Sequence, residues 1–105
     1  MRITMRRQGQ RVWMQARGDF DLFVREPFLI QVQSLIEDGM RELQLDLSRV
    51  HFLGSTGVSA LLRARRVLTG RGGSLQVGPT STEARESLEQ LGLAQLLLGP
   101  ERRAG

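Results

Sequence analysis

The sequence predicts an α/β fold with a mixed, mainly parallel sheet of four to five strands and about three helices packed mostly on one face. Several short segments alternate apolar with polar residues, which is the pattern of strands with one buried face. Longer stretches between them repeat apolar residues every three or four positions, as amphipathic helices do. The expected order is ββαβαβαβ, and strands joined through a helix pair in parallel.

Length and composition agree with one globular domain. A chain of 105 residues can bury one hydrophobic core but not two, and its apolar and charged fractions of 40% and 25% are ordinary. The absence of cysteine excludes disulfides, a thiol nucleophile and Cys-based metal sites. No apolar run is long enough for a membrane span or a signal segment. We therefore expect a cytoplasmic monomer or weak dimer, with no membrane insertion, no cofactor and no metal.

The formal net charge of +4 comes from arginine, because all fifteen basic residues are arginine. Nucleic-acid binding would require this charge on one face, together with a recognisable reading element. A solvated arginine-rich surface is the simpler interpretation, so acidic protein partners are favoured and no nucleic acid is expected. The arginines gather at Arg2, Arg6, Arg7, Arg11 and Arg17 on the first strands and at Arg63, Arg65 and Arg66 along a helix.

A hairpin is expected to open the fold. Residues 2–6 and 12–16 alternate between apolar and polar, and a turn is expected at residues 8–10. Trp13 falls on the face opposite the other apolar residues of its strand, where packing against the sheet is favoured over a partner contact.

The first helix is expected from about Val24 to Asp38 and to end at Gly39. Proline has no N–H to give to a helix, so Pro27 is expected in the first turn. The apolar stripe consists of Phe28, Val32, Leu35 and Ile36.

A strand at residues 43–47 follows, and then a helix at about 56–69 that the glycines of 70–73 end. The next strand is expected at residues 74–78, with Pro79 stopping it because proline cannot donate to a sheet.

A third helix comes next, capped by Thr80 in a Thr-x-x-Glu capping box or by Ser81. Gly92 is expected to end it. Leu96–Leu98 is expected to form a last short strand, and residues 100–105 a flexible tail.

The loop between the strand at 43–47 and its helix carries two hydroxyls, Ser55 and Thr56, between Gly54 and Gly57. A hydroxyl oxygen at a helix start can accept a backbone N–H as an N-cap. A phosphate added to the same oxygen would meet the positive end of the helix dipole. These residues alone leave both interpretations open, a cap and a switch.

The wider segment resembles the signature of STAS domains, the family of bacterial anti-sigma factor antagonists. The resemblance rests on LDLS at 45–48, on FLGSTGV at 52–58 and on the order of elements across almost the whole chain. GDFD at 18–21 is similar to the Gly-Glu-Leu-Asp that follows the second strand in the family. The chain departs from the pattern at Gly54, where the family has Asp. The resemblance implies one STAS-like domain over residues 1–99.

By this resemblance, Ser55 is the residue that a partner kinase phosphorylates, with Thr56 as second choice. The unmodified domain would bind an anti-sigma factor that is a serine protein kinase, freeing a sigma factor. Phosphorylation from ATP would switch the domain off, and a phosphatase acting on phospho-Ser55 would reverse this. The expected partner-binding residues are Asp19, Asp21, Gly54, Ser55, Thr56, Gly57 and Arg63.

A docking subunit and an enzyme are the two other classes of function that these residues raise. A STAS subunit that docks on the ATPase of a lipid-transport ABC complex, or in a stress-signalling assembly, would use the same loop without a phosphorylation cycle, and Gly54 favours it mildly. An enzyme is not expected: His51 lies near Ser55, but no third orienting group or nucleophile elbow accompanies the pair. Asp19 and Asp21 have no further ligands nearby in sequence, so Asp21 is interpreted as a loop or cap residue.

Overall fold

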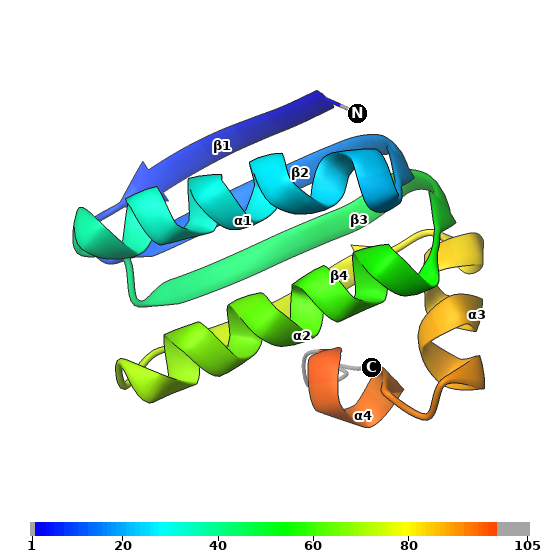
Figure 1. Cartoon of the computed structure of the whole chain (residues 1–105). Coiled ribbons are helices and arrows are strands. Elements are labelled where there is room, and N and C mark those ends of the chain that lie inside the picture. The colour runs from blue at the N-terminus through cyan, green and yellow to red at the C-terminus, as the bar shows by residue number, and fades with distance from the viewer. Residues whose placement is uncertain (1, 99–105) are drawn as a thin grey trace.

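An opening hairpin and two strand–helix–strand units make up the sheet in the computed structural model, which describes residues 2–98 (Figure 1). The strands lie in the order β1-β2-β3-β4, with β1 antiparallel to β2 and the other neighbours parallel. The predicted α/β class and mixed, mainly parallel sheet are therefore confirmed. The elements are β1 Arg2–Gln8, β2 Arg11–Phe20, α1 Leu22–Glu37, β3 Glu42–Leu53, α2 Ser55–Gly70, β4 Ser74–Thr80, α3 Thr82–Gln90 and α4 Ala94–Leu97.

Helices α1 and α2 lie side by side over one face of the sheet, with α3 and α4 near β4 (Figure 1). The stripe of α1 packs inward through Phe28, Val32 and Ile36, and the rings of Phe20 and Phe28 meet edge to face with centroids 5.1 Å apart. Burying each such side chain contributes roughly 1.5–3 kcal/mol. None of the helices within residues 2–98 is long and apolar enough to cross a membrane.

Trp13 faces away from the buried side of β2, as its place in the alternation predicts. Its neighbours Val12 and Met14 are 0% and 1% exposed, whereas Trp13 is half-buried. The guanidinium carbons of Arg6 and Arg11 lie 5.9 and 4.8 Å from the centroid of its ring. The indole is therefore covered by cation–π contacts within its own sheet, in agreement with a packing role.

The start of α1 differs from the prediction. The helix begins at Leu22, because the carboxylate of Asp21 accepts a hydrogen bond from the backbone N–H of Phe23 at 3.1 Å and so caps it. Pro27 consequently lies in the second turn, where its missing N–H leaves the carbonyl of Phe23 without its helical donor. Phe23 is 85% exposed, so water can replace that donor. The prediction that Asp21 is a cap residue is confirmed.

Two expectations for the C-terminal third, the end of β4 and the last strand, are wrong, and of the two caps expected for α3 the structure has the second. Strand β4 continues through Pro79 to Thr80, which an edge strand tolerates because proline then lacks an N–H only toward solvent. The cap of α3 is Ser81, whose hydroxyl accepts the N–H of Ala84 at 3.0 Å, and not Thr80.

The expected last strand is replaced by the short helix α4, after which Leu98 makes a single parallel bridge to Val77. Gly92, with φ of +71°, ends α3 as predicted. The expected tail at 100–105 lies outside the described residues.

Candidate functional site

Ser55 is the first residue of α2, and its side chain caps nothing. The N-cap is Gly54, in an extended conformation and without a side-chain hydrogen bond, and the first helical bond runs from the N–H of Val58 to the carbonyl of Gly54 at 2.9 Å. Ser55 is exposed and Thr56 is half-buried. Of the two interpretations that the sequence leaves open, the structure contradicts the capping one.

The N-terminus of α2 has a positive potential that no acidic residue of the helix itself offsets. Its first turn contains no acidic residue. The first N–H groups of any helix have no partner within the helix, and they add to the positive end of the dipole. A negative group on the hydroxyl of Ser55 would therefore be attracted by its own helix.

The Ser55 loop lies against the end of β2, where Asp19 and Asp21 are found. Strand pairing places Asp19 opposite Phe52, and the N–H of Gly54 donates to the carbonyl of Phe20 at 3.1 Å. The fold thus brings together two segments that are more than thirty residues apart in sequence. Asp19 is exposed and Asp21 half-buried, so both carboxylates are accessible beside the loop.

Gly57 allows this close approach. A Cβ added at Gly57 would overlap the carbonyl oxygen of Phe20, and it would lie 2.8 Å from Cδ1 of Phe20 and 3.1 Å from Cδ1 of Leu53. A residue with a side chain would therefore push the first turn of α2 away from β2. Gly57 is buried, and its lack of a side chain lets the first turn of α2, which carries Ser55, pack against the end of β2.

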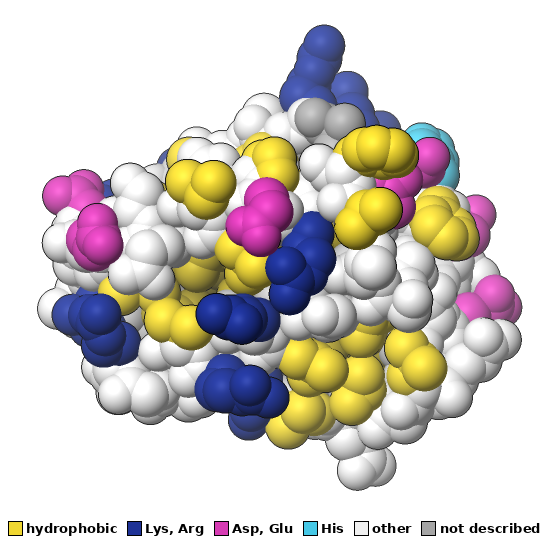
Figure 2. Space-filling view, in the orientation of Figure 1, with side chains coloured by type: hydrophobic (Ala, Val, Ile, Leu, Met, Phe, Trp, Pro, Cys, Tyr) yellow, Lys and Arg dark blue, Asp and Glu magenta, His cyan; other side chains and the backbone are white. Residues whose placement is uncertain are grey.

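Three apolar side chains border the two loops: Leu22, Phe23 and Phe52, which are 63%, 85% and 53% exposed. Figure 2 shows hydrophobic side chains next to acidic ones and to the single histidine at the upper right, the end where these loops lie in Figure 1. Exposed apolar groups that gather in one place commonly mark an interaction surface.

These apolar residues are not among the predicted contact residues, although the sequence carries signals for them. Adjacent strand residues face opposite sides, so Phe52 cannot share the core with its buried neighbour Leu53. Phe23 and Ile30 are seven residues apart, which places them on one helix face that is separate from the inward stripe.

The ring of Phe52 fills the space that a side chain at residue 54 would occupy. A Cβ built on Gly54 would come within 2.9 Å of Cε2 and 3.2 Å of Cζ of the Phe52 ring. The ring therefore lies directly against the backbone that precedes Ser55. At this position, where the resembling family has a carboxylate, the loop presents an aromatic surface.

Arg63 is separated from the other predicted contact residues. It lies eight residues after Ser55 on α2, about 12 Å along the helix axis. It lines a groove of about 280 Å³ between α1 and α2, together with Arg25, Ile30 and Val67. A partner would have to extend along both helices to contact Arg63 and Ser55 at once.

The remaining titratable groups of interest lie outside the two loops. Asp46 is partly buried, which raises its pKa, but hydrogen bonds from Ser48 and Gln15 and the charge of Arg49 more than offset this and lower the pKa below 3.8. The hydrogen bond from Gln15 to Asp46 joins β2 to β3, so this network has a structural role. His51 is exposed. Within residues 2–98, no group of three His, Asp or Glu side chains is arranged to hold a metal ion.

Comparisons with known proteins agree with this architecture. A family model described as "Mlab, STAS domain" matches residues 3–99. No curated protein sequence matches the chain.

Solved structures are similar across nearly the whole chain. The anti-sigma factor antagonist SpoIIAA in its unphosphorylated form has a TM-score of 0.83 at 17% identity, covering 96% of this chain and 90% of that one. An anti-sigma factor antagonist from Mycobacterium paratuberculosis has a TM-score of 0.81 at 22% identity, with 96% and 86% covered. The Bacillus cell fate determinant SpoIIAA in its phosphorylated form has a TM-score of 0.72 at 17% identity, with 96% and 93% covered. At such identities, the likeness establishes the fold.

Proposed function

The chain belongs to the STAS domain family, and from this premise we propose that it is a cytoplasmic signalling module that docks on an anti-sigma factor of the serine kinase type. Phosphorylation of Ser55 ends the docking, and a phosphatase restores it. The observation that carries the proposal is the position of Ser55: an exposed hydroxyl at the first residue of a helix, free of any capping bond. Solved relatives of this fold are described in unphosphorylated and phosphorylated forms.

The switch needs only local electrostatics. A phosphate brings a charge of about −1.5 to −2 at neutral pH and three acceptor oxygens. On this chain it is attracted by the free N–H groups and the dipole of α2. The same charge enters the surface on which a partner docks, where it must be desolvated and where Asp19 and Asp21 already supply negative charge. Phosphorylation therefore leaves the fold intact and opposes the complex.

The surface beside Ser55 suits a partner with an apolar centre and basic residues at the rim. Leu22, Phe23 and Phe52 supply apolar area, and Asp19 and Asp21 supply negative charge. Aromatic side chains that become buried on binding contribute much of the affinity of protein interfaces, while rim charges set orientation and association rate. The module acts through this contact and catalyses no reaction itself.

The test is to mix the purified protein with the anti-sigma kinases of its host and ATP, and to map the phosphate by mass spectrometry. We expect modification at Ser55, loss of the phosphate in Ser55→Ala, and weaker kinase binding by Ser55→Asp. Ser59→Ala is the matched control, because Ser59 is an exposed hydroxyl one turn further along α2. If no kinase binds or modifies the protein, the switch is refuted; modification at Thr56 would move the site by one residue.

One observation favours a second function, a docking subunit without a phosphorylation cycle, such as a partner of the ATPase of a lipid-transport ABC complex. The ring of Phe52 occupies the space at Gly54, so the loop offers an apolar contact and no carboxylate before Ser55. In that case Ser55→Asp binds its partner as tightly as the unmodified chain does, whereas Phe52→Ala weakens binding. Measuring both variants against the same partner separates the two functions.

A further inference from the structure

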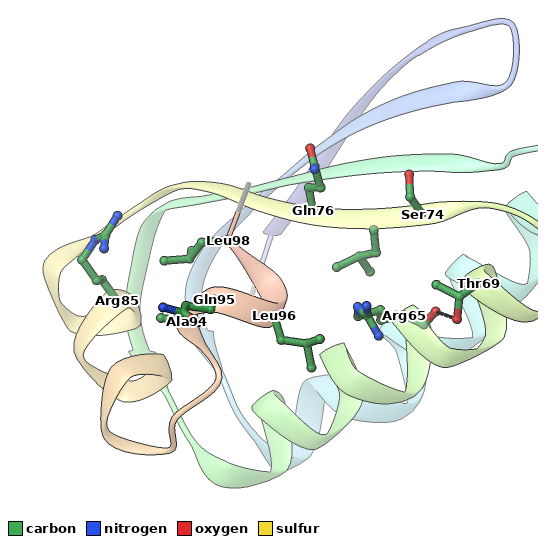
Figure 3. A pocket seen from close by; sticks show the side chains of 10 residues that line it. Arg65, Thr69, Ser74, Gln76, Arg85, Ala94, Gln95, Leu96 and Leu98 are labelled. Atoms are coloured by element: carbon green, nitrogen blue, oxygen red, sulfur yellow. Dashed lines mark hydrogen bonds between the residues drawn. The ribbon is translucent and has the colours of Figure 1, made fainter. Parts of the chain in front are cut away.

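A cavity lies between α2, β4 and α4, away from the Ser55 loop. Its volume is about 580 Å³, within the usual range of small-molecule sites. The apolar part of its wall comes from Leu75 of β4, Leu96 of α4 and Leu98, while Arg65 and Thr69 of α2 supply polar groups (Figure 3). Leu75 is buried and Leu96 is 44% exposed, so the cavity has an apolar floor and one open side.

The guanidinium of Arg65 is the notable polar group. Arg65 is half-buried, and Figure 3 shows its side chain directed into the cavity toward Leu96. Within residues 2–98, the side chain of Arg65 has no hydrogen bond or ion pair. Arg85, at the far end of the cavity, differs because it is paired with Glu89 at 3.3 Å. A half-buried guanidinium that has no carboxylate partner is available to bind an anion.

The other polar groups narrow the choice of ligand. The hydroxyl of Thr69 donates to the carbonyls of Arg65 and Arg66 at 2.9 and 3.1 Å, so its proton is taken and its oxygen can only accept. The side chain of Ser74 points to the other side of β4 in Figure 3. Gln76, Gln95 and Arg85 also line the cavity, but of the lining groups that the structure describes, Arg65 is the charged donor directed into it that is not already in an ion pair, and its planar fork fits a carboxylate or a phosphate.

We propose that this cavity is a binding site for a small anionic amphiphile, with its carboxylate or phosphate head on Arg65 and its hydrocarbon part against Leu75, Leu96 and Leu98. The site is independent of the proposed switch. Arg65 lies ten residues after Ser55 on α2, about 15 Å along the helix axis, so a ligand here does not occlude the loop.

The experiment is calorimetric titration of the intact protein with decanoate and decyl phosphate, each below its micelle concentration, and with decanol below its solubility limit. We expect both anions to bind with one ligand per chain and decanol to bind at least tenfold more weakly, since only the anions meet Arg65. The stronger of the two anions identifies the head group as carboxylate or phosphate. Equal binding of decanol, or no binding of either anion at millimolar concentration, overturns the proposal.

Two pairs of variants locate the site. Arg65→Gln is expected to weaken anion binding about tenfold or more, whereas Arg66→Gln, at an exposed position on the same helix, leaves it unchanged. Leu96→Ala is expected to weaken binding, whereas Leu91→Ala, at a similarly exposed leucine outside the cavity, does not. Equal losses in Arg65→Gln and Arg66→Gln would mean non-specific charge attraction and would also overturn the proposal. Thermal unfolding of each variant verifies that the fold is retained.

Discussion

Replacing Gly57 by alanine tests whether close contact between α2 and β2 positions the Ser55 loop. The new methyl group would overlap the backbone carbonyl oxygen of Phe20, which cannot rotate away as a side chain can, and would crowd the Phe20 ring at 2.8 Å. Overpacking of this kind costs about 1–3 kcal/mol, and contact with backbone favours the upper half of that range. Alanine returns up to about 1 kcal/mol of helix propensity. The expected net loss is about 2 kcal/mol.

For a domain of this size, such a loss lowers the melting temperature by roughly 8–16 °C. Urea unfolding followed by the fluorescence of Trp13, with thermal unfolding followed by circular dichroism, measures it. Gly70→Ala is the control, because a Cβ at Gly70, the last residue of the same helix, meets no atom within 4 Å. Its stability should equal or slightly exceed that of the unmodified chain. If Gly57→Ala is as stable as Gly70→Ala, the contact does not constrain the loop and the reasoning fails.

Three further predictions concern interactions that stabilise the fold. Ser81→Ala should cost about 1 kcal/mol by removing the cap of α3, and Thr80→Ala clearly less; equal losses in urea unfolding would contradict the assignment of the cap. The pKa of Asp46 is lower in the folded state than in the unfolded state, so its carboxylate stabilises the fold above about pH 4. This stabilisation is lost as the pH falls through the folded-state pKa. The free energy of unfolding, measured between pH 2 and 6, should therefore depend less on pH in Asp46→Asn. Arg7→Gln should lower the free energy of unfolding by about 1 kcal/mol, because the guanidinium of Arg7 donates to the carboxylate and the carbonyl of Asp38 at 2.8 and 2.7 Å. The difference in that free energy between 0.1 and 1 M salt should be smaller in the variant. An unchanged difference would speak against the ion pair.

The fold could be predicted because its signals are local and repeated. Alternation marks the strands, the stripe at Phe28 and Val32 marks α1, and the glycine at Gly92 marks a helix end, and each follows from side-chain periodicity or backbone freedom. The parallel order of the sheet then follows from the strand–helix–strand connections. The prediction of a last strand was wrong because three consecutive leucines at 96–98 show no periodicity that distinguishes a strand from a helical turn.

The candidate site was predictable in part. Ser55 and Ser81 present the same local signal, a hydroxyl before a helical pattern. Ser81 caps its helix, whereas Ser55 is the first residue of its helix and caps nothing. The difference depends on which residue takes the extended cap conformation, and at the first site Gly54 takes it. A tertiary contact, which single-residue patterns do not encode, brings Gly57 against the end of β2, and the local path of the chain after β3 brings the ring of Phe52 against Gly54.

The packing of Phe52 on Gly54 makes these two positions dependent on each other in evolution. A mutation that introduces a carboxylate at residue 54 adds a charge and also turns an aromatic ring away from the backbone, so one codon change alters two properties of the surface. Replacing Phe52 first removes the obstacle and lets the second change act through charge alone. Homologues with a side chain at the position of Gly54 are accordingly expected to turn any aromatic residue at the position of Phe52 away from it.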